Sequence, residues 1–327
     1  MQDYQTWRDL LSHIIEEPRE RERIAKTIGI DTTTLTSWAR NTATPNARQL
    51  RSLLQAIPRH PMLLRTLIAE EFDGFDAELD DAPPHAIPIT FSARVLELYA
   101  SAPDESRFWS ICTAVLSEAV KQLDPDNFGI SLSVMQCMPL SREGKVYCLR
   151  EYVRLGTSPW FDQMEMSTSF LGTESLAGAA VSSRRPQIVE DINQGQRAAT
   201  YVPEYAVSAA AFPITHSNRI AGCLLAASTQ TGYFSSPARQ ELIQNYSALL
   251  VLAFSPENFY EREQIALQIM PPFQVQQPYL STLQQRILAT LKTAFSVNRS
   301  ISYLEAQQHV YDQIAEELLQ IHLHPGV

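Results

Sequence analysis

The sequence predicts two folded units, an all-α bundle at the N-terminus and an α+β unit with an antiparallel sheet, followed by C-terminal helices. Its 327 residues exceed the ~100–200 residues that one domain usually holds. Helical periodicity prevails over residues 3–70, and strand-like runs begin only after residue 126. Between these regions lies a segment with the composition of a linker. We therefore expect a multidomain chain.

The composition is that of a folded globular protein. Hydrophobic residues make up 45% of the chain and charged residues 19%, which is too apolar for a disordered protein. No segment approaches the ~18 apolar residues of a membrane span, and residues 1–20 carry acids where a signal peptide needs a basic start. We expect a cytoplasmic protein without a membrane partner.

Charge is distributed unevenly along the chain. The formal net charge is −10, which by itself argues against a nucleic-acid partner. Residues 1–65, however, hold ten Lys/Arg against seven Asp/Glu, a net of +3, and the remainder carries −13. The basic charge is therefore concentrated in the N-terminal unit.

The four cysteines stand singly, without a CxxC pair or a Cys/His cluster. This spacing predicts neither a zinc site nor a disulfide framework. We expect reduced core residues at Cys112, Cys137, Cys148 and Cys223, and no metal site.

The domain organisation follows from these patterns. We expect a helical unit at residues 1–71, a linker at 72–90, the α+β unit at 91–256 and a C-terminal helical extension at 257–327. The linker gathers five acids and three prolines with little periodicity, which is typical of an extended, solvated segment.

Helices and strands alternate in the α+β unit. Residues 91–122 have helical periodicity, and a short strand is expected at 187–189 with a hairpin turn at 216–219. The pattern predicts longer strands at 127–137, 145–154, 207–216 and 219–228, and helices at 173–183 and 236–254.

Two apolar stripes mark the C-terminal extension. Either they pack onto the chain's own sheet or they form a dimer interface, and the sequence leaves both readings open. Prolines at 271, 272 and 278 exclude one continuous coiled coil. The stripes consist of Leu283, Ile287, Leu288, Leu291 and Phe295, and of Leu304, Tyr311, Ile314 and Leu318.

A pair of helices joined by a tight turn is predicted at residues 21–40. Ile24, Ala25 and Ile28 form the inner face of the first helix, and Gly29 supplies the turn. Asp31 or Thr32 caps the second helix. Leu35 and Trp38 anchor the second helix inward, which leaves Thr32, Thr33, Thr34, Ser37 and Arg40 facing outward.

This stretch resembles the Cro/CI-type helix-turn-helix family. The matching features are Ile24-Ala25, Gly29-Ile30, Leu35 to Trp38, and Pro45 to Leu50, while Ala39 and Asn41 stand where the family often has Glu and Gly. The resemblance implies that the second helix enters the major groove of double-stranded DNA and that a dimer binds an inverted repeat. Arg19, Arg21 and Arg23 are further candidates for phosphate contacts. The expected DNA-binding residues are Thr32, Thr33, Thr34, Ser37, Arg40, Asn41, Arg48 and Arg51.

A second set of motifs lies between residues 170 and 254. It comprises Gly-x-x-x-Leu-Ala-Gly at 172–178, Arg-Pro-x-Ile-Val-x-Asp at 185–191, the hairpin around 216–219 and a Phe-Ser before the last helix. This order resembles a GAF domain over about residues 91–254. The resemblance implies an antiparallel sheet with a ligand pocket roofed by residues 155–206.

The resemblance leaves the cofactor unknown. The signatures of cyclic-nucleotide and bilin-binding members are not apparent. Aromatic walls with a few polar groups are typical of ligand pockets. The expected ligand-binding residues are Trp160, Phe161, Phe170, Tyr201, Tyr205 and Phe212, with Glu174, Arg197 and Thr200 as polar contacts to the ligand.

These motifs together predict a ligand-controlled transcriptional regulator that acts as a homodimer. A signalling adaptor that uses both units for protein contacts stays open as an alternative. So does a thiol-dependent methionine sulfoxide reductase, because Cys137 and Cys148 fall on predicted neighbouring strands. The sequence holds no Ser/His/Asp order, phosphate-cradling glycine loop or HExxH, and we expect no enzyme.

Overall fold

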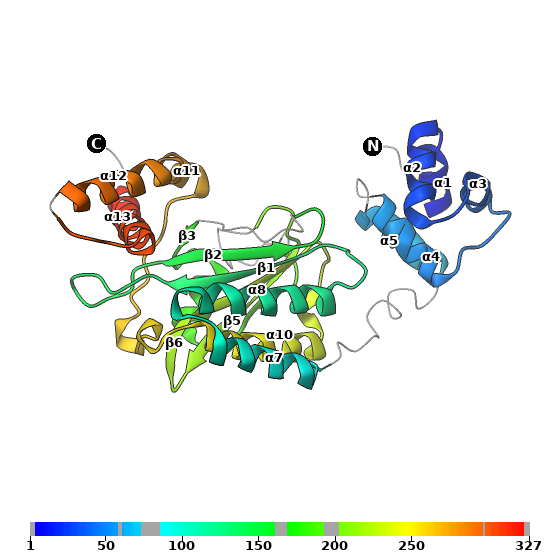
Figure 1. The fold of residues 1–327 in the computed structure, drawn as a ribbon. Helices are drawn as coiled ribbons and strands as arrows, with labels where there is room; N and C mark the ends of the chain where they lie inside the picture. The colour runs from blue at the N-terminus through cyan, green and yellow to red at the C-terminus, as the bar shows by residue number, and fades with distance from the viewer. Residues whose placement is uncertain are drawn as a thin grey trace. The chain divides into compact units, whose positions relative to one another are not determined.

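A computed structural model describes residues 4–57, 61–72, 86–160, 169–192, 203–296 and 298–323. The chain divides into two compact units (Figure 1). The first comprises residues 1–84 with 124–129, and the second comprises residues 85–123 with 130–327. The C-terminal helices thus belong to the second unit. No helix among the described residues is long and apolar enough to cross a membrane.

The first unit is all-α in the part that the structure describes. Two of its helices begin at capping boxes, which the Thr6 and Asn46 side chains form with Asp9 and Gln49. Two buried tryptophans, Trp7 and Trp38, lie in its core. The helices are α1 (Trp7–Ile14), α2 (Pro18–Ile28), α3 (Thr32–Ala39), α4 (Ala47–Ala56) and α5 (Pro61–Glu71).

The second unit is built on a six-stranded sheet in which every pair of neighbouring strands is antiparallel. The strand order is β3-β2-β1-β6-β5-β4. The expected hairpin is present, and its turn residues Ser217 and Asn218 have φ of 47° and 63°, as a two-residue turn requires. The strands are β1 (Ile130–Cys137), β2 (Leu149–Gly156), β3 (Phe170–Leu171), β4 (Gln187–Val189), β5 (Ser208–His216) and β6 (Arg219–Ser228).

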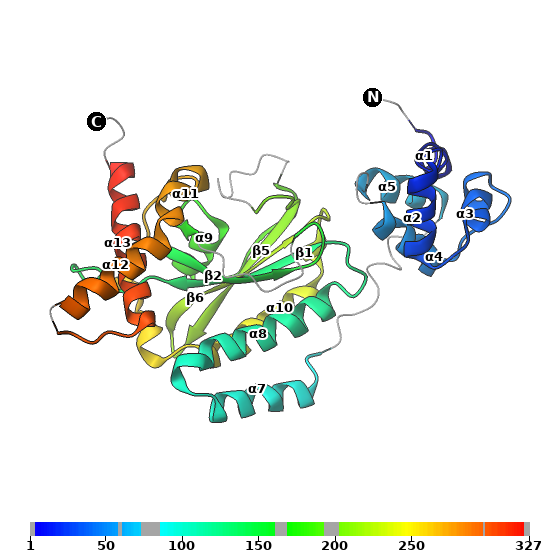
Figure 2. The ribbon, with the colours of Figure 1, turned by 45° about the horizontal axis from the view of Figure 1, so that its top comes forward.

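Helices cover both faces of this sheet. One face packs against α7 (Ile89–Ser101), α8 (Asp104–Leu123) and α10 (Pro237–Leu250) in one apolar core. The opposite face carries α9 (Leu176–Ser183), as Figure 2 shows. Short 3-10 segments follow the sheet at η2 (Tyr233–Ser235), η3 (Val251–Ala253), η4 (Pro256–Asn258) and η5 (Arg262–Gln264).

The C-terminal helices are α11 (Phe273–Ser281), α12 (Leu283–Ser296) and α13 (Tyr303–Leu323). They bury Ile287, Tyr311 and Ile314 against the β2–β3 side of the same unit's sheet. Most members of the two predicted apolar stripes thus pack within the chain's own sheet unit. Leu288, Phe295 and Leu304 are the members of the stripes that stay exposed.

A strap of residues 264–276 joins these helices to the sheet edge. Gln268 donates its backbone N–H to the Tyr147 carbonyl at 2.8 Å and accepts from the Thr173 N–H at 3.0 Å. The buried Gln276 side chain then pairs with both backbone groups of Phe170, each at 2.8 Å. The edge strand β3 is therefore closed by the chain itself, in the way that sheet edges need.

Two glycines permit this close packing. A Cβ atom added to Gly172 would lie 1.7 Å from the Gln268 carbonyl oxygen, and one added to Gly178 would lie 1.9 Å from the Gly172 carbonyl oxygen. The Gly-x-x-x-Leu-Ala-Gly motif is therefore a packing requirement of the α9 turn and the strap.

We predict that Gly172→Ala destabilises the second unit by about 3 kcal/mol, because the added methyl group meets backbone and forces the strap away from β3. Urea unfolding of the full chain measures this change. Ala179→Ser, on the exposed side of α9, is the matched control and should leave the free energy of unfolding unchanged. A Gly172→Ala protein as stable as wild type would contradict the packing argument.

Candidate functional site

The first candidate site is formed by α2, the turn at Gly29 and α3. Gly29 has φ of 78°, and its N–H donates to the Ala25 carbonyl at 3.0 Å, which ends α2. Asp31 then caps α3 by accepting from the Thr34 N–H at 2.7 Å. Of the two cap residues that the sequence allowed, the structure uses Asp31.

The predicted outward face of α3 is only partly exposed. Leu35 and Trp38 are buried, as expected. Thr33 and Arg40 are exposed, and so is Asn41 just beyond the helix. Thr32, Thr34 and Ser37 are half-buried, so their hydroxyl groups lie closer to the helix surface than the sequence pattern alone suggests.

The hydroxyl hydrogens on this face are already used within the helix. Thr33 donates to the Asp31 carboxylate, and Thr34 donates to it at 3.1 Å. Ser37 donates to the Thr33 carbonyl at 2.9 Å. The Thr33 hydrogen bond is the main reason that the pKa of the exposed Asp31 lies below its usual value. The face therefore offers a carboxylate and hydroxyl lone pairs as acceptors, and Arg40 as a donor.

The other arginines that were predicted to contact DNA phosphates differ in their exposure and in their partners. Arg23 pairs with Glu20 at 2.7 Å and donates to the Ala56 carbonyl at 2.8 Å, so it braces α2 against the end of α4. Arg19 is exposed and Arg21 half-buried. Arg48 and Arg51 lie on α4, and their side chains fall outside the described part of the structure.

A buried arginine that the sequence reading missed fixes the position of α3. Arg8 on α1 donates to the Trp38 carbonyl at 2.6 Å and forms an ion pair with Glu71 of α5 at 2.7 Å. Its guanidinium also lies 4.3 Å from the Trp7 ring centroid, and the Trp7 indole donates to Glu71 at 2.7 Å. One cation thus ties three helices together.

The second candidate site is the α9 side of the sheet. The strand register places Gly156, Ser131, Ala227 and Ala209 in one row across four strands. All four residues are small, which keeps side-chain bulk low at this end of the face.

Polar groups adjoin this row on β2. Glu151 is 2% exposed and accepts from the Ser169 hydroxyl at 3.1 Å. The Arg154 Nε atom lies 3.8 Å from the Glu151 carboxylate. A β-bulge opposite Val134 and Met135 puts both charged residues on the same face. Because buried charges are costly, a carboxylate kept here is a candidate for binding chemistry.

Trp160 and Tyr205 are the predicted aromatic residues that the structure brings together. Their ring centroids are 6.4 Å apart in an edge-to-face arrangement. The Trp160 Nε1 atom is buried and has no hydrogen-bond partner among the described residues. Trp160 also lies beside Gly156, because a Cβ atom on Gly156 would be 3.0 Å from the Trp160 Cβ.

Three other predicted ligand residues lie elsewhere. Phe212 is buried in the core formed with α8 and α10, on the opposite face of the sheet. Phe170 is buried under the C-terminal helices. Glu174 accepts from the Gly172 N–H at 2.7 Å and the Met270 N–H at 2.9 Å, so it holds the strap. Strand alternation explains the two misplaced phenylalanines. Phe161, Arg197, Thr200 and Tyr201 lie outside the described residues.

All four cysteines are buried and free, and they are distributed over three apolar clusters. Cys137 lies in the core beneath α9, whereas Cys148 lies in the core beneath the C-terminal helices. The two thiols are not bridged, but they lie close enough that Cys137 adds to burial in raising the pKa of Cys148. Burial raises the pKa of all four thiols. No group of three His, Cys, Asp or Glu residues that could hold a metal ion occurs within the described ranges.

About half of the chain is similar in fold to solved GAF-domain structures. The GAF domain of an Acinetobacter phosphoenolpyruvate-protein phosphotransferase is 16% identical with a TM-score of 0.33, over 50% of this chain and 90% of that one. A putative GAF sensor protein from Burkholderia vietnamiensis is 13% identical with a TM-score of 0.34, over 50% and 89%. No protein-family model and no curated protein matches this chain.

A type II free methionine-R-sulfoxide reductase from Thermoplasma acidophilum is also similar to this part of the chain. It is 16% identical with a TM-score of 0.32, over 46% of this chain and 99% of that one. The expectation that this chain is not an enzyme is corrected by such matches, because enzymes are among the structures that it resembles. That expectation depended on the absence of short catalytic motifs from the sequence. Such an absence does not exclude catalysis by residues that lie far apart in the sequence. At this identity and TM-score the likeness establishes no activity.

We predict that Arg8→Met loosens the first unit, because the Trp38 carbonyl loses a short hydrogen bond and the Glu71 carboxylate loses its ion-pair partner and keeps only the Trp7 indole as a donor. Glu71 is 37% exposed, so solvent replaces part of the loss and the cost is about 2 kcal/mol. Hydrogen exchange in the full chain should show weaker protection of α1 and α3. Arg40→Met is the control. Equal hydrogen-exchange protection of α1 and α3 in the two variants would contradict the structural role of Arg8.

We predict that a thiol reagent such as DTNB modifies none of the four cysteines in the native protein at pH 8 and all four after denaturation. Burial and the raised pKa both keep the reactive thiolate scarce. Rapid modification of Cys137 or Cys148 in the native state would contradict this and favour the thiol-reductase reading.

Proposed function

We propose that this protein is a sequence-specific DNA-binding transcriptional regulator, a homodimer on an inverted repeat, whose state is set by a small ligand on the α9 side of the sheet. In this proposal α3 is the recognition helix of a Cro/CI-like helix-turn-helix unit. The small ligand acts through its different affinity for two arrangements of the protein.

The single observation that carries the DNA-binding part is the joint between α2 and α3. A left-handed Gly29 and an Asp31 cap set the two helices in sequence, while Leu35 and Trp38 bury one side of α3. The other side presents Thr33, Arg40 and Asn41. Short polar side chains and one arginine on an exposed helix face suit a major groove.

Support for the ligand comes from the buried Glu151, the nearby Arg154 and the unpartnered Trp160 indole beside a row of small residues. A carboxylate, a guanidinium and an indole N–H would hold a small polar metabolite with both a donor and an acceptor. Trp160 and Tyr205 would supply its apolar contacts.

The decisive experiment is selection of bound sequences from random duplex DNA by the full-length protein at two salt concentrations. An enriched inverted repeat whose binding weakens with salt would support the regulator. No enrichment and no salt-sensitive binding would overturn the proposal and favour the signalling adaptor.

We predict that Arg40→Ala weakens binding to the selected DNA about tenfold, the cost of one lost contact from a charged side chain. Thr33→Ala and Ser37→Ala should weaken it less, because their hydroxyl hydrogens are already used inside α3. Electrophoretic mobility shift titrations give the dissociation constants. Arg299→Ala, an exposed arginine of the second unit, is the matched control. Unchanged binding in all three α3 variants would contradict the recognition-helix assignment.

We predict that a small polar metabolite raises the melting temperature of the full chain and that Trp160→Phe reduces this rise. The substitution removes the buried N–H donor and keeps most of the aromatic surface. Trp109→Phe is the matched control, since Trp109 lies on α8 and is 37% exposed. A rise that is the same in both variants would place the ligand elsewhere.

A further inference from the structure

A groove of about 690 Å³ lies between α12 and α13, two helices that pack side by side in the C-terminal extension (Figure 1). This volume falls within the ~300–1,000 Å³ that small-molecule sites usually have. The groove lies beyond residues 91–254, over which the sequence resembles a GAF domain, and neither candidate site described above includes it. It is therefore a candidate for a separate ligand site.

The α12 wall of this groove is made of small side chains, namely Ala289, Thr290, Thr293 and Ala294. The Thr290 and Thr293 hydroxyl groups donate to carbonyls of their own helix at 2.9 Å and 3.0 Å, so these hydrogens are not available to a ligand. On the core side of α12, the large Ile287 is fully buried. The two helices thus meet through large side chains below and leave a channel with methyl groups along its α12 wall.

Arg286 lies at one end of this wall, in the first turn of α12. Its Nε atom donates to the Thr282 hydroxyl at 3.0 Å, and its two terminal nitrogens donate to the Glu317 carboxylate at 2.7 Å and 3.0 Å. These bonds use three of the five N–H groups of the guanidinium and hold it in place. Two donors are left for a ligand.

Arg299 lies at the other end, just after α12. Its backbone N–H donates to the Ala294 carbonyl at 2.9 Å. Because Arg286 and Ala294 are eight positions apart, the two arginines are anchored about 12 Å from each other along the helix. The Arg299 side chain is exposed and forms no hydrogen bond or ion pair with the residues that the structure describes. All of its donors are therefore available.

Glu305 is the acid among the described residues that line the groove, and it is already engaged. Its carboxylate accepts from the Ser302 N–H at 2.7 Å, which is the main reason that its pKa lies below its usual value. The charge of Arg299 lowers this pKa further. Each arginine thus has one carboxylate nearby, Glu317 or Glu305, which offsets part of its charge. A ligand group with a single negative charge matches such an end better than a phosphate does.

We propose that this groove binds an elongated dicarboxylate, with one carboxylate at Arg286, the other at Arg299 and the aliphatic middle on the methyl groups of the α12 wall. The free donors at the two ends require a ligand that brings acceptors. The separation of the arginines requires a chain with an acid group at each end. His309 and Gln313 of α13 form the opposite wall, so a bound chain would hold α12 and α13 together.

The test is an NMR titration of the full chain, without DNA, with three probes: suberate, the shorter dicarboxylate succinate, and octanoate, which has the length of suberate and one carboxylate. We expect a dissociation constant of about 1 mM for suberate, as its size and the open groove allow. Succinate and octanoate should each bind about tenfold more weakly, because neither engages both arginines. No binding of suberate, or equal affinity for suberate and either of the other probes, would overturn the proposal.

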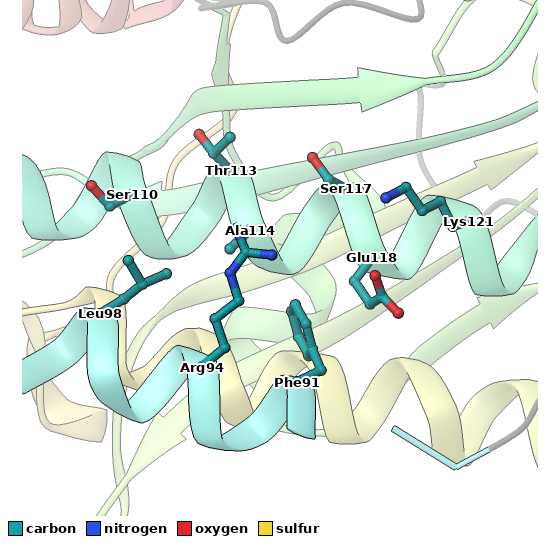
Figure 3. A pocket seen from close by; sticks show the side chains of 9 residues that line it. All are labelled: Phe91, Arg94, Leu98, Ser110, Thr113, Ala114, Ser117, Glu118 and Lys121. Atoms are coloured by element: carbon teal, nitrogen blue, oxygen red, sulfur yellow. The ribbon is translucent and has the colours of Figure 1, made fainter. Parts of the chain in front are cut away.

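Variants then locate the probe. Arg299→Gln should weaken suberate binding about tenfold, to the level of octanoate, and keep the melting temperature, because this side chain is exposed. Thr293→Leu, at an exposed position of the α12 wall, should weaken binding by filling the groove. Arg94→Gln is the matched control, since Arg94 is an exposed arginine in a different groove, the one of about 280 Å³ between α7 and α8 (Figure 3). Undiminished suberate binding by Arg299→Gln would overturn the proposal.

Trp160→Phe separates this groove from the proposed ligand site on the α9 side of the sheet. The substitution should leave suberate binding unchanged. A loss of binding in Trp160→Phe but not in Arg299→Gln would place the dicarboxylate on the α9 side and overturn this inference. Because the titrations contain no DNA, their outcome does not depend on whether the chain selects a DNA sequence.

Discussion

Closure of the sheet edge at β3 is the constraint on which the second unit depends. An uncovered strand edge exposes backbone groups that recruit other chains, and burying them without partners is costly. Here the strap closes the edge with its own N–H and carbonyl groups and with the amide of Gln276. The strap can lie this close only because Gly172 has no side chain. The C-terminal helices are therefore part of the sheet unit.

The same closure connects the proposed ligand site at Glu151 to the C-terminal helices. Ser169, which donates to the buried Glu151, is the neighbour of Phe170, whose backbone Gln276 holds. Glu174 holds Met270 a few residues along the strap. A change at Glu151 would thus reach the C-terminal helices through a short series of hydrogen bonds. Such a series is a physical route for coupling, and a ligand would use it only by favouring one of two arrangements.

Buried cations serve structure in both units. Arg8 links α1, α3 and α5, and its position determines how α3 is presented. In the second unit Arg150 lies between the Tyr152 and Tyr311 rings, at 4.2 Å and 3.9 Å from their centroids, and burial lowers its pKa. It thereby joins β2 to α13. Neither arginine stands out in the sequence, because a cation buried among aromatic rings leaves no spacing pattern.

The sequence by itself determined the order of helices and strands, because periodicity and turn residues are local. The Gly29 turn, a cap at Asp31 or Thr32, and the hairpin at 216–219 could all be predicted from a few neighbouring positions. It also predicted Trp160 and Tyr205 as parts of one site, and the structure places their rings 6.4 Å apart. Only the tertiary structure decided which face each side chain occupies. A single bulge in β2 puts Glu151 and Arg154 together, strand alternation turns Phe212 to the opposite core, and the strap engages Glu174. These outcomes depend on contacts between residues far apart in the chain, which local patterns do not contain.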